Sequence, residues 1–333
     1  MKIAGKGFVT MLDKWYQTIT KEHALIGISI TRIFFGIAIL YIFLINYPTR
    51  YLLWGAHGLY PYSEYHAYVQ KENFFTLFDL SSSDLFIDIF FTIGILAAIG
   101  YIVGYHTRFM GILLAVLIFS LYYRNPEITH GGDNILRIML IYLIFARVNA
   151  YFSLDAMRAK KLKENPSNNL FNIIQTNETW QAIRAVFHNF AWIACILQLA
   201  CLYFAAGAYK MMGDLWQSGT ALYYASRVQD FYTPHLTELL WMFEPMIVFM
   251  TYFTIVFQVS FPFLLLNRYT KYLAIVCACS FHLGIAVFMG LADFSWIMIG
   301  CEFMLLLDHE YRKIYQFISK LKRRTNVAQK QAA

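Results

Sequence analysis

The chain has 333 residues, of which 59% are hydrophobic and only 14% are charged, and its mean hydropathy is +0.49. It contains 30 Phe and 24 Tyr residues and carries a formal net charge of +7. This composition excludes an ordinary soluble enzyme, because a soluble core does not need apolar stretches as long as a membrane-crossing helix.

The apolar stretches predict an all-α integral membrane protein with about eight transmembrane helices. A helix needs about 20 mostly apolar residues to cross the hydrocarbon core of a bilayer. The third, fourth and eighth stretches are short for this length and fit tilted or partly re-entrant helices. In chain order, the predicted spans cover residues 24–46, 84–104, 108–123, 133–148, 185–207, 245–266, 271–289 and 293–308.

The distribution of basic residues predicts the orientation. Most of the 27 Lys and Arg residues lie on one side of this topology, in residues 1–23, the loop 147–184, two short turns and the tail 309–333. The positive-inside rule therefore places both termini in the cytoplasm of a multi-pass protein of the cell membrane. The asymmetry explains the net charge without a nucleic acid partner, and it leaves the lipid bilayer as the expected partner. We treat residues 1–333 as one membrane domain.

Polar and glycine-rich loops gather on the opposite, extracytoplasmic side. They run through residues 47–83, 123–134 and 207–224 and contain more Gly, Pro, Asn, Asp and His than an interfacial aromatic belt requires. We therefore place the candidate active site on this side. All five cysteines lie inside predicted spans, which indicates apolar packing and not a disulfide framework.

Ionisable residues inside or at the ends of apolar stretches are functional candidates, because an unpaired charge in a membrane is costly. Here they are Arg32, Asp133, Arg137, Lys210 and His282. Lys210 ends the fifth span after small residues that let a ligand or helix approach. It is either a lysine that snorkels to the interface or one held in an apolar pocket, where loss of its charge would make it a base.

Asp133 and Arg137 are four residues apart at the start of the fourth span, so they share one helix face. One interpretation is a helix cap with an intrahelical ion pair. The alternative is that both point into the bundle and position a polar substrate. Arg124 and Asn125, across the same loop, would then complete a polar floor.

His282 lies in the seventh span, about two turns from its outer end. It is either a packing residue or a carrier of protons near Lys210. The sequence contains no HExxH motif and no Cys/His spacing typical of a metal site, so no metal is expected.

The order and spacing of several short motifs resemble the horizontally transferred transmembrane domain family, which is related to the membrane part of vitamin K-dependent gamma-carboxylase. The resemblance covers about residues 24–308. Its motifs are Gly58-Leu59-Tyr60-Pro61, Tyr123-Arg124-Asn125-Pro126 with Gly131-Gly132-Asp133, Tyr151-Phe152-Ser153-Leu154-Asp155, Tyr203-Phe204-Ala205-Ala206-Gly207-Ala208-Tyr209-Lys210 with Trp216, Gly219 and Tyr223, and Phe281-His282 with Gly290 and Phe294-Ser295.

In the carboxylase, the lysine at the matching helix end deprotonates vitamin K hydroquinone, oxygen converts the quinol to an epoxide, and a peptide glutamate is carboxylated. The resemblance therefore implies that Lys210 and His282 are catalytic. It also implies reduced vitamin K or menaquinol, O2 and CO2 as cofactors. The candidate residues for binding substrate or cofactor are Arg124, Asn125, Asp133, Asn134, Arg137, Tyr209 and Trp216.

The chain departs from the carboxylase in having Gly132-Asp133 in place of an Asn-His pair, and no large extracytoplasmic C-terminal region. A second relative, the membrane component of the sporulation-delaying toxin maturation system, also lacks that region and works with partner proteins on a secreted peptide.

Two functions follow from the resemblance. The first is a quinol-epoxidising, carboxylase-like enzyme that acts on a peptide at the outer face. The second is a partner-dependent maturation factor for a secreted peptide toxin, without quinone chemistry of its own. A transporter is disfavoured because no internal repeat is visible. A bacterial source is expected.

Overall fold

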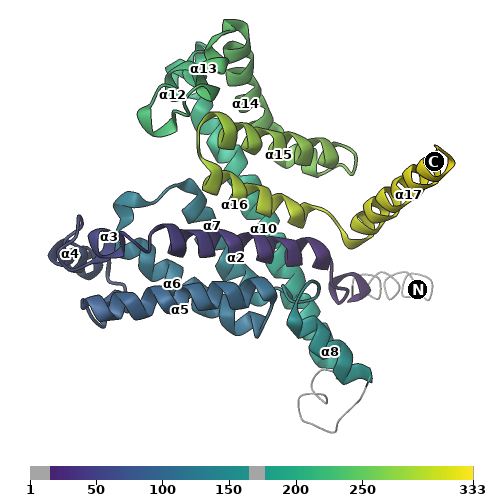
Figure 1. Cartoon of the computed structure of the whole chain (residues 1–333), viewed down its shortest axis with the longest axis horizontal. Coiled ribbons are helices and arrows are strands. Elements are labelled where there is room, and N and C mark those ends of the chain that lie inside the picture. The colour runs from purple at the N-terminus through teal and green to yellow at the C-terminus, as the bar shows by residue number, and fades with distance from the viewer. Residues whose placement is uncertain (1–15, 165–176, 333) are drawn as a thin grey trace, which may run out of the picture.

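The computed structural model describes residues 16–164 and 177–332, and within these ranges every regular element is a helix (Figure 1). This confirms the predicted all-α class. The elements in chain order are α2 (Leu25–Ile45), α3 (Arg50–Trp54), α4 (Tyr62–Glu72), η1 (Leu77–Asp79), α5 (Asp84–Val103), α6 (Thr107–Arg124), η2 (Pro126–Ile128), α7 (Gly131–Phe145), α8 (Leu154–Glu164), α10 (Glu178–Met211), α11 (Asp214–Gln217), α12 (Ala221–Ala225), η3 (Gln229–Phe231), α13 (Leu236–Trp241), α14 (Glu244–Leu265), α15 (Thr270–Phe288), α16 (Ala292–Glu302), η4 (Phe303–Leu305) and α17 (Asp308–Ala332).

Among the described residues, six helices are long and apolar enough to cross a membrane: α2, α5, α6, α10, α14 and α15. This confirms a helical, multi-pass membrane protein in contact with lipid. The predicted fourth and eighth spans correspond to α7, with 15 residues, and α16, with 11 residues. At 1.5 Å per residue these helices are roughly 22 and 16 Å long, which is short of a bilayer core. The count of eight spans therefore stays a prediction.

The two short helices are covered by longer helices on one side, while Ile141 and Phe145 of α7 and Trp296 of α16 are exposed. α16 packs against α2, α7 and α15, and α7 packs against α6, α10 and α16. Close approach depends on glycine: a Cβ built on Gly27 of α2 would lie 2.2 Å from the carbonyl oxygen of Phe303. The hydroxyl of Thr31 donates to the carbonyl of Gly300 at 2.8 Å. A helix that packs along longer helices does not need to match the bilayer thickness by itself, which explains how these two can be so short.

The first and last membrane elements meet at one end of the bundle. The carboxylate of Asp308 accepts hydrogen bonds from the backbone N–H groups of Leu25 and Ile26, at 3.2 and 2.7 Å. These N–H groups begin α2 and have no partner within the helix. The prediction that both ends of the domain lie on one side of the membrane is consistent with this contact. Residues 1–15 of the predicted N-terminal segment, and 165–176 of the predicted loop, lie outside the described residues.

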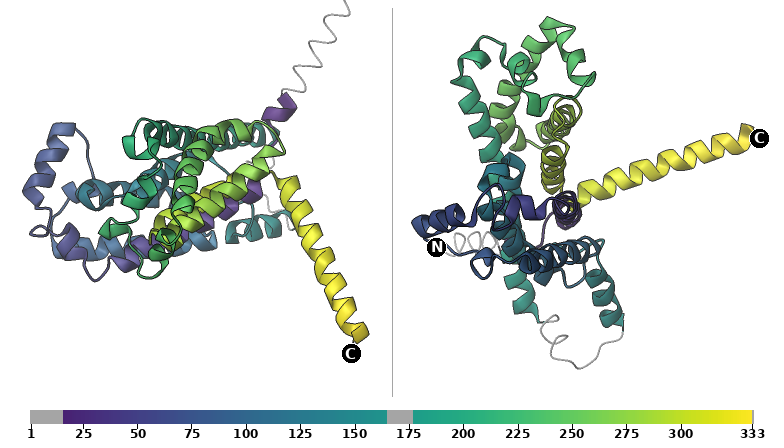
Figure 2. Two further views of the ribbon diagram at one scale, coloured as in Figure 1. Left: turned by 90° about the horizontal axis from the view of Figure 1, so that it is seen from above. Right: turned by 60° about the vertical axis from the view of Figure 1, so that its left-hand side comes forward.

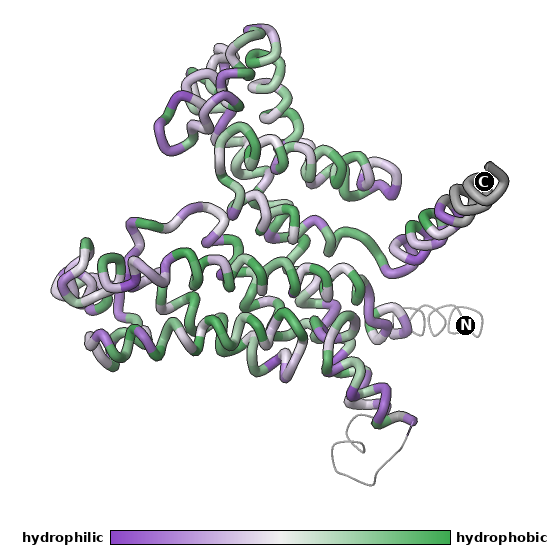
Figure 3. Tube along the Cα trace, in the orientation of Figure 1, coloured by the Kyte–Doolittle hydropathy of each residue, from purple (hydrophilic) through white to green (hydrophobic). Residues whose placement is uncertain are grey.

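The polar residues gather at the two ends of the bundle and along α17 (Figure 3). Helix α17 is polar overall and projects away from the other helices in both views of Figure 2. Helix α10 has 34 residues and packs against both α7 and α14. It therefore joins the group formed by α2 and α5–α7 to the group formed by α12–α15 (Figure 1).

Arg32 is fully buried and fastens three segments together. Its Nη1 donates to the carbonyls of Tyr101 and Ile102, at 2.5 and 3.0 Å, and its Nη2 donates to the carbonyl of Phe152 at 2.6 Å. The first two carbonyls belong to the last turn of α5, where carbonyls lack the usual helical partner, although that of Tyr101 also accepts from the N–H of Gly104 at 3.3 Å. Gly104 follows with a φ of +72°, where a Cβ would lie 2.6 Å from Nη1. Arg32 is therefore a structural residue.

Candidate functional site

Arg124 and Asn125 hold the first outer loop against the end of α6. The two Nη groups of Arg124 donate to the carbonyls of Tyr60 and Gly55, at 2.9 and 2.6 Å. Asn125 Nδ2 donates to the carbonyl of Leu53 at 2.8 Å. Both side chains are almost completely buried. In the predicted polar floor, the Nη groups of Arg124 and Nδ2 of Asn125 thus bind backbone carbonyls, while Arg124 Nε is buried without a partner among the described residues. These contacts give Arg124 a role in shaping the loop.

A histidine and two aspartates meet where α7 and α16 begin. His130 Nδ1 accepts a hydrogen bond from the N–H of Gly132 at 3.0 Å, so its Nε2 carries the hydrogen and donates to Asp293 at 2.7 Å. The carboxylate of Asp133 accepts from the backbone N–H of His130 at 3.0 Å and completes a capping box. Asp133 therefore caps α7, as one interpretation of the sequence predicts.

The predicted ion pair between Asp133 and Arg137 is not formed, and the reason is that His130 occupies the carboxylate. Arg137 instead donates to the side chain of Asn134 at 2.8 Å and lies over the ring of Tyr123, 5.0 Å from its centre. Asn134 is exposed, so this pair faces away from the bundle interior.

The aspartates border a small outer pocket of about 100 Å³ between the ends of α2, α6, α7 and α16. Asn125, His130, Asp133 and Asp293 supply its polar wall, and Trp54 is among its apolar residues. The Oδ1 atom of Asn125 is buried and has no hydrogen-bond partner in the described part of the chain. The pocket therefore offers an unused acceptor beside a histidine–aspartate pair.

His130 should make the stability of the protein depend on pH. Burial opposes its charge, but the hydrogen bond to Asp293 and the two nearby carboxylates outweigh burial and raise the pKa of His130 above its ordinary 6.5. A raised folded-state pKa adds stability that is complete below the unfolded-state pKa and is lost as pH rises through the folded-state value. His130→Asn, which keeps a cap for α7, should therefore lower Tm most near about pH 6, with a smaller difference near about pH 9.

The matched control adds Asp293→Asn to both the wild type and His130→Asn. Because this change removes the partner of His130, the Tm difference between the two proteins should then vary less with pH. A Tm difference that stays constant from acidic to basic pH would show that His130 acts only as a cap.

A chain of polar groups lies deeper in the bundle. The hydroxyl of Tyr203 donates to Glu302 Oε1 at 2.9 Å, and its oxygen lies 2.7 Å from His282 Nε2. Since the hydroxyl hydrogen points to Glu302, His282 Nε2 must donate to Tyr203. His282 Nδ1 and Glu302 Oε2 are buried without a partner among the described residues. The three side chains, from α10, α15 and α16, thus form a directed hydrogen-bond chain with a free polar atom at each end.

Glu302 is the residue that the sequence analysis missed. It is 1% exposed and lies inside the predicted eighth span. The signal was present, because a carboxylate within an apolar stretch is a candidate for the same reason as the lysine and histidine. His282 is hydrogen-bonded to Tyr203 and contacts the ring of Phe294, whose centre is 5.4 Å away. Both interpretations of His282, as a packing residue and as a carrier of protons, remain predictions.

Lys210 lies in the last turn of α10, the same helix that carries Tyr203, at the end that the sequence predicts to be outer. Residues 203, 207 and 210 are spaced so that they share one face of α10, and seven residues correspond to roughly 10 Å along the axis. The Lys210 amine lies 5.2 Å from the centre of the Trp216 ring, and no described carboxylate forms an ion pair with it. The neighbouring Tyr209 is 73% exposed and points elsewhere.

The wall opposite this face of α10 is α14. A Cβ on Gly207 would lie 2.8 Å from the side chain of Val259 and 3.0 Å from Cβ of Gln258, so glycine permits the contact. Gln258 Oε1 is buried and has no partner among the described residues. A free acceptor therefore lies beside Gly207, one turn below Lys210.

The candidate residues fall into three places, and Phe294 connects two of them. Its ring makes edge contacts with His282 and with His130, at centre distances of 5.4 and 6.5 Å. One phenyl ring thus lies between the outer pocket and the buried chain. Lys210 with Trp216 forms the third place, and no direct contact of Lys210 with His282 is present in the described part of the chain.

Comparisons of the chain with protein-family models, with curated proteins and with solved structures find no significant match. The resemblance to the carboxylase-related family therefore stays a prediction, and the function has to be argued from the geometry of these residues.

Proposed function

We propose that the protein is a membrane enzyme that oxidises a lipid quinol, reduced vitamin K or menaquinol, with O2 at its outer face, in the manner of a gamma-carboxylase. One observation carries the proposal: Lys210 is a half-buried amine without a carboxylate partner, on the same face of α10 as the buried chain of Tyr203, His282 and Glu302. A base at the rim and a chain of exchangeable protons beneath it suit a reaction that begins with deprotonation.

The residues around Lys210 fit an apolar molecule that carries hydroxyl groups. Gln258 Oε1 is a buried acceptor without a partner, and the amine of Lys210 is close to the aromatic ring of Trp216. Apolar side chains that are exposed at the end of α10, including Met211 and Met212, would contact lipid and admit a ligand from the bilayer. These groups would hold the quinol by one hydroxyl and by its ring.

One quinol and one O2 give one epoxide and one water, and in a carboxylase this oxidation supplies the base strength to replace a peptide Cγ–H by a carboxylate from CO2. The residues of this chain have two roles in the proposed reaction. Lys210 Nζ accepts the first proton, and Tyr203 passes protons between His282 and Glu302, because its hydroxyl can donate and accept at once.

The experiment that tests the proposal uses the purified protein in lipid nanodiscs. Reduced vitamin K and, separately, menaquinol are supplied with oxygen, and the epoxide is measured by mass spectrometry against empty nanodiscs. Epoxide above the empty-disc level supports the enzyme and turns attention to the peptide acceptor. Its absence with both quinols rejects the proposed chemistry.

A second function is favoured by the outer loops. Large apolar side chains there are exposed, among them Leu59 (69%), Leu80 (65%) and Met242 (79%). We infer that this face could bind a secreted peptide and partner proteins that mature it, without quinone chemistry. The two functions separate in the native host. The gene is deleted, and a secreted peptide that disappears from the medium is identified. The Lys210→Ala variant is then expressed in the deletion strain. It restores the peptide if the protein is a maturation factor, and it fails to restore the peptide if the protein is the proposed enzyme.

A further inference from the structure

A second cavity lies at the other end of the bundle from Lys210 and the outer pocket. It measures about 1120 Å³ and is enclosed by the start of α6, the end of α7, α8, the first turns of α10 and residues that precede α2. This is the end that the distribution of basic residues places in the cytoplasm. None of the residues proposed for quinol chemistry lines it.

The lining of this cavity is strongly basic. Its basic residues are Arg108, Arg147, Arg158, Lys160 and Arg184, and its acidic residues are Glu22 and Asp155. Five basic residues face two acidic ones, so the lining keeps an excess of three positive charges.

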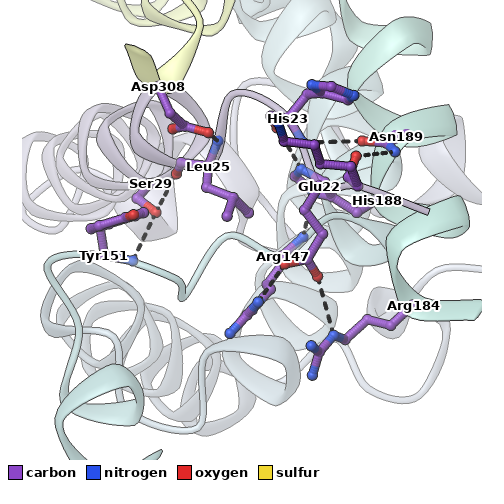
Figure 4. A network of polar contacts seen from close by, with 11 residues as sticks. Glu22, His23, Leu25, Ser29, Arg147, Tyr151, Arg184, His188, Asn189 and Asp308 are labelled. Atoms are coloured by element: carbon purple, nitrogen blue, oxygen red, sulfur yellow. Dashed lines mark hydrogen bonds and ion pairs between the residues drawn. The ribbon is translucent and has the colours of Figure 1, made fainter. Parts of the chain in front are cut away.

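Glu22 holds the two arginines nearest the bundle axis. It forms ion pairs with Arg147 and with Arg184, the latter at 3.2 Å (Figure 4). The backbone of Arg147 is fixed in turn, because its N–H donates to His188 at 3.0 Å. Figure 4 shows both guanidinium groups on the same side of Glu22. This wall is therefore rigid and carries one positive charge more than it carries negative.

Asp155 caps the start of α6. Its carboxylate accepts from the backbone N–H groups of His106 and Thr107, at 3.0 and 2.9 Å. Burial opposes ionisation, but these hydrogen bonds, together with those from the side chains of Thr107 and Asn149, lower the pKa of Asp155. The carboxylate is ionised and its oxygens are used, so it does not reach across to the arginines of the cavity.

Arg108 and Arg158 are the basic groups that the fold leaves available. Neither forms an ion pair with a described carboxylate, and Arg158 lies over the ring of Tyr105, 4.5 Å from its centre. Stacking on an aromatic ring leaves the N–H groups at the edge of the guanidinium free to bind an anion. A planar guanidinium binds two oxygens of a phosphate at once.

The cavity also has an apolar side that is exposed on the surface of the helix bundle. Phe109 and Ile112 of α6 line it and are 63% and 43% exposed, and Leu143 and Ile144 line it from α7. An occupant must therefore carry a negative head and an apolar body, and it can enter laterally between membrane helices. Basic pockets between transmembrane helices on the cytoplasmic side are suited to anionic lipid headgroups.

We propose that this cavity binds an anionic phospholipid, with its phosphate between Arg108 and Arg158 and an acyl chain along Phe109 and Ile112. The proposal does not depend on the quinol chemistry, since the two sites share no residue.

The test uses the full chain in nanodiscs of neutral phosphatidylcholine, with or without phosphatidylglycerol, and measures Tm and the lipid retained by native mass spectrometry. Phosphatidylglycerol should raise Tm of the wild type. The double variant Arg108→Gln, Arg158→Gln should bind the lipid about 25-fold more weakly, from about a factor of five for each arginine near a membrane surface.

Arg268→Gln is the matched control, because Arg268 lies over the ring of Tyr269 at 4.6 Å, carries one charge at the same predicted side and does not line the cavity. It should keep the wild-type response. Equal loss in Arg268→Gln and the double variant would show nonspecific attraction and overturn the site.

Inorganic phosphate and glycerol phosphate distinguish binding of the headgroup alone from binding of the lipid. If either raises Tm as much as the phospholipid does, the site binds a soluble anion and the proposed lipid is rejected. In neutral nanodiscs both variants should have the wild-type Tm, and a double variant that is already unstable there is replaced by Phe109→Gln, which alters the apolar side alone.

Discussion

Replacing Lys210 by alanine is expected to lower quinol epoxidation about 10²- to 10⁴-fold, the usual range for loss of a general base. The protein should still fold and insert into the membrane. Among the described residues, the amine contacts the ring of Trp216, 5.2 Å from its centre, and such contacts contribute about 0.5–1 kcal/mol at exposed sites. The rate of epoxide formation and the Tm of the same preparation measure the two effects separately.

Lys210→Arg is the informative control for this prediction. Arginine keeps a cation over the ring but stays protonated at any accessible pH, so it cannot act as a base. Both variants should therefore be inactive and stable. If Lys210→Ala fails to accumulate in membranes while Lys210→Arg behaves like the wild type, the lysine is an interfacial anchor and the proposed role is wrong. Tyr203→Phe, which removes only a hydroxyl, should reduce the rate less than Lys210→Ala, because it interrupts the chain below the base.

Replacing Arg32 by methionine is expected to lower the free energy of unfolding by about 3 kcal/mol, because neutral carbonyls at the end of α5 and at Phe152 lose a charged donor. Methionine has a similar length but no donor, so three carbonyls lose their hydrogen bond from Arg32, and among the described residues only that of Tyr101 keeps a second donor, the N–H of Gly104. Each unpaired carbonyl costs about 1–3 kcal/mol, and the costs are not fully additive. Unfolding of purified protein by increasing fractions of SDS, followed by circular dichroism, measures the change.

Arg32→Lys should lie between methionine and wild type, since an ammonium can reach some of the carbonyls but lacks the planar fork. Arg268→Met, at an exposed position, should change the free energy of unfolding by less than about 0.5 kcal/mol. A small change in the free energy of unfolding for Arg32→Met would mean that water satisfies the carbonyls. The hydrogen bonds of Arg32 would then not be needed to hold α5 to α2.

The sequence predicts the class of fold well and the environment of single charges poorly, for a physical reason. Long apolar stretches report the bilayer directly, so the six long helices are recognisable. The short helices α7 and α16 are as apolar as spans because they pack along longer helices, and composition does not distinguish contact with protein from contact with lipid.

The partners of individual charges depend on contacts between distant parts of the chain. Arg124 and the carbonyl it binds in Tyr60 are 64 residues apart, and His130 and Asp293 are 163 residues apart. No local pattern specifies such pairs. A local pattern does predict the Asp133 cap, and the structure shows that cap. The role of Lys210 is local in sequence and remains a prediction, since only an assay tests it.

The contact between the first and last helices imposes an order on biosynthesis. Asp308 caps Ile26 across 282 residues of chain. At about 5–20 residues per second, α2 waits in the membrane for roughly 15–60 seconds before its cap is synthesised. During that interval the surface of α2 at Gly27, the notch against which Phe303 later packs, must be covered by lipid or by an insertion factor. A chain that stops before α16 keeps the notch open, so truncated products become substrates for membrane quality-control proteases.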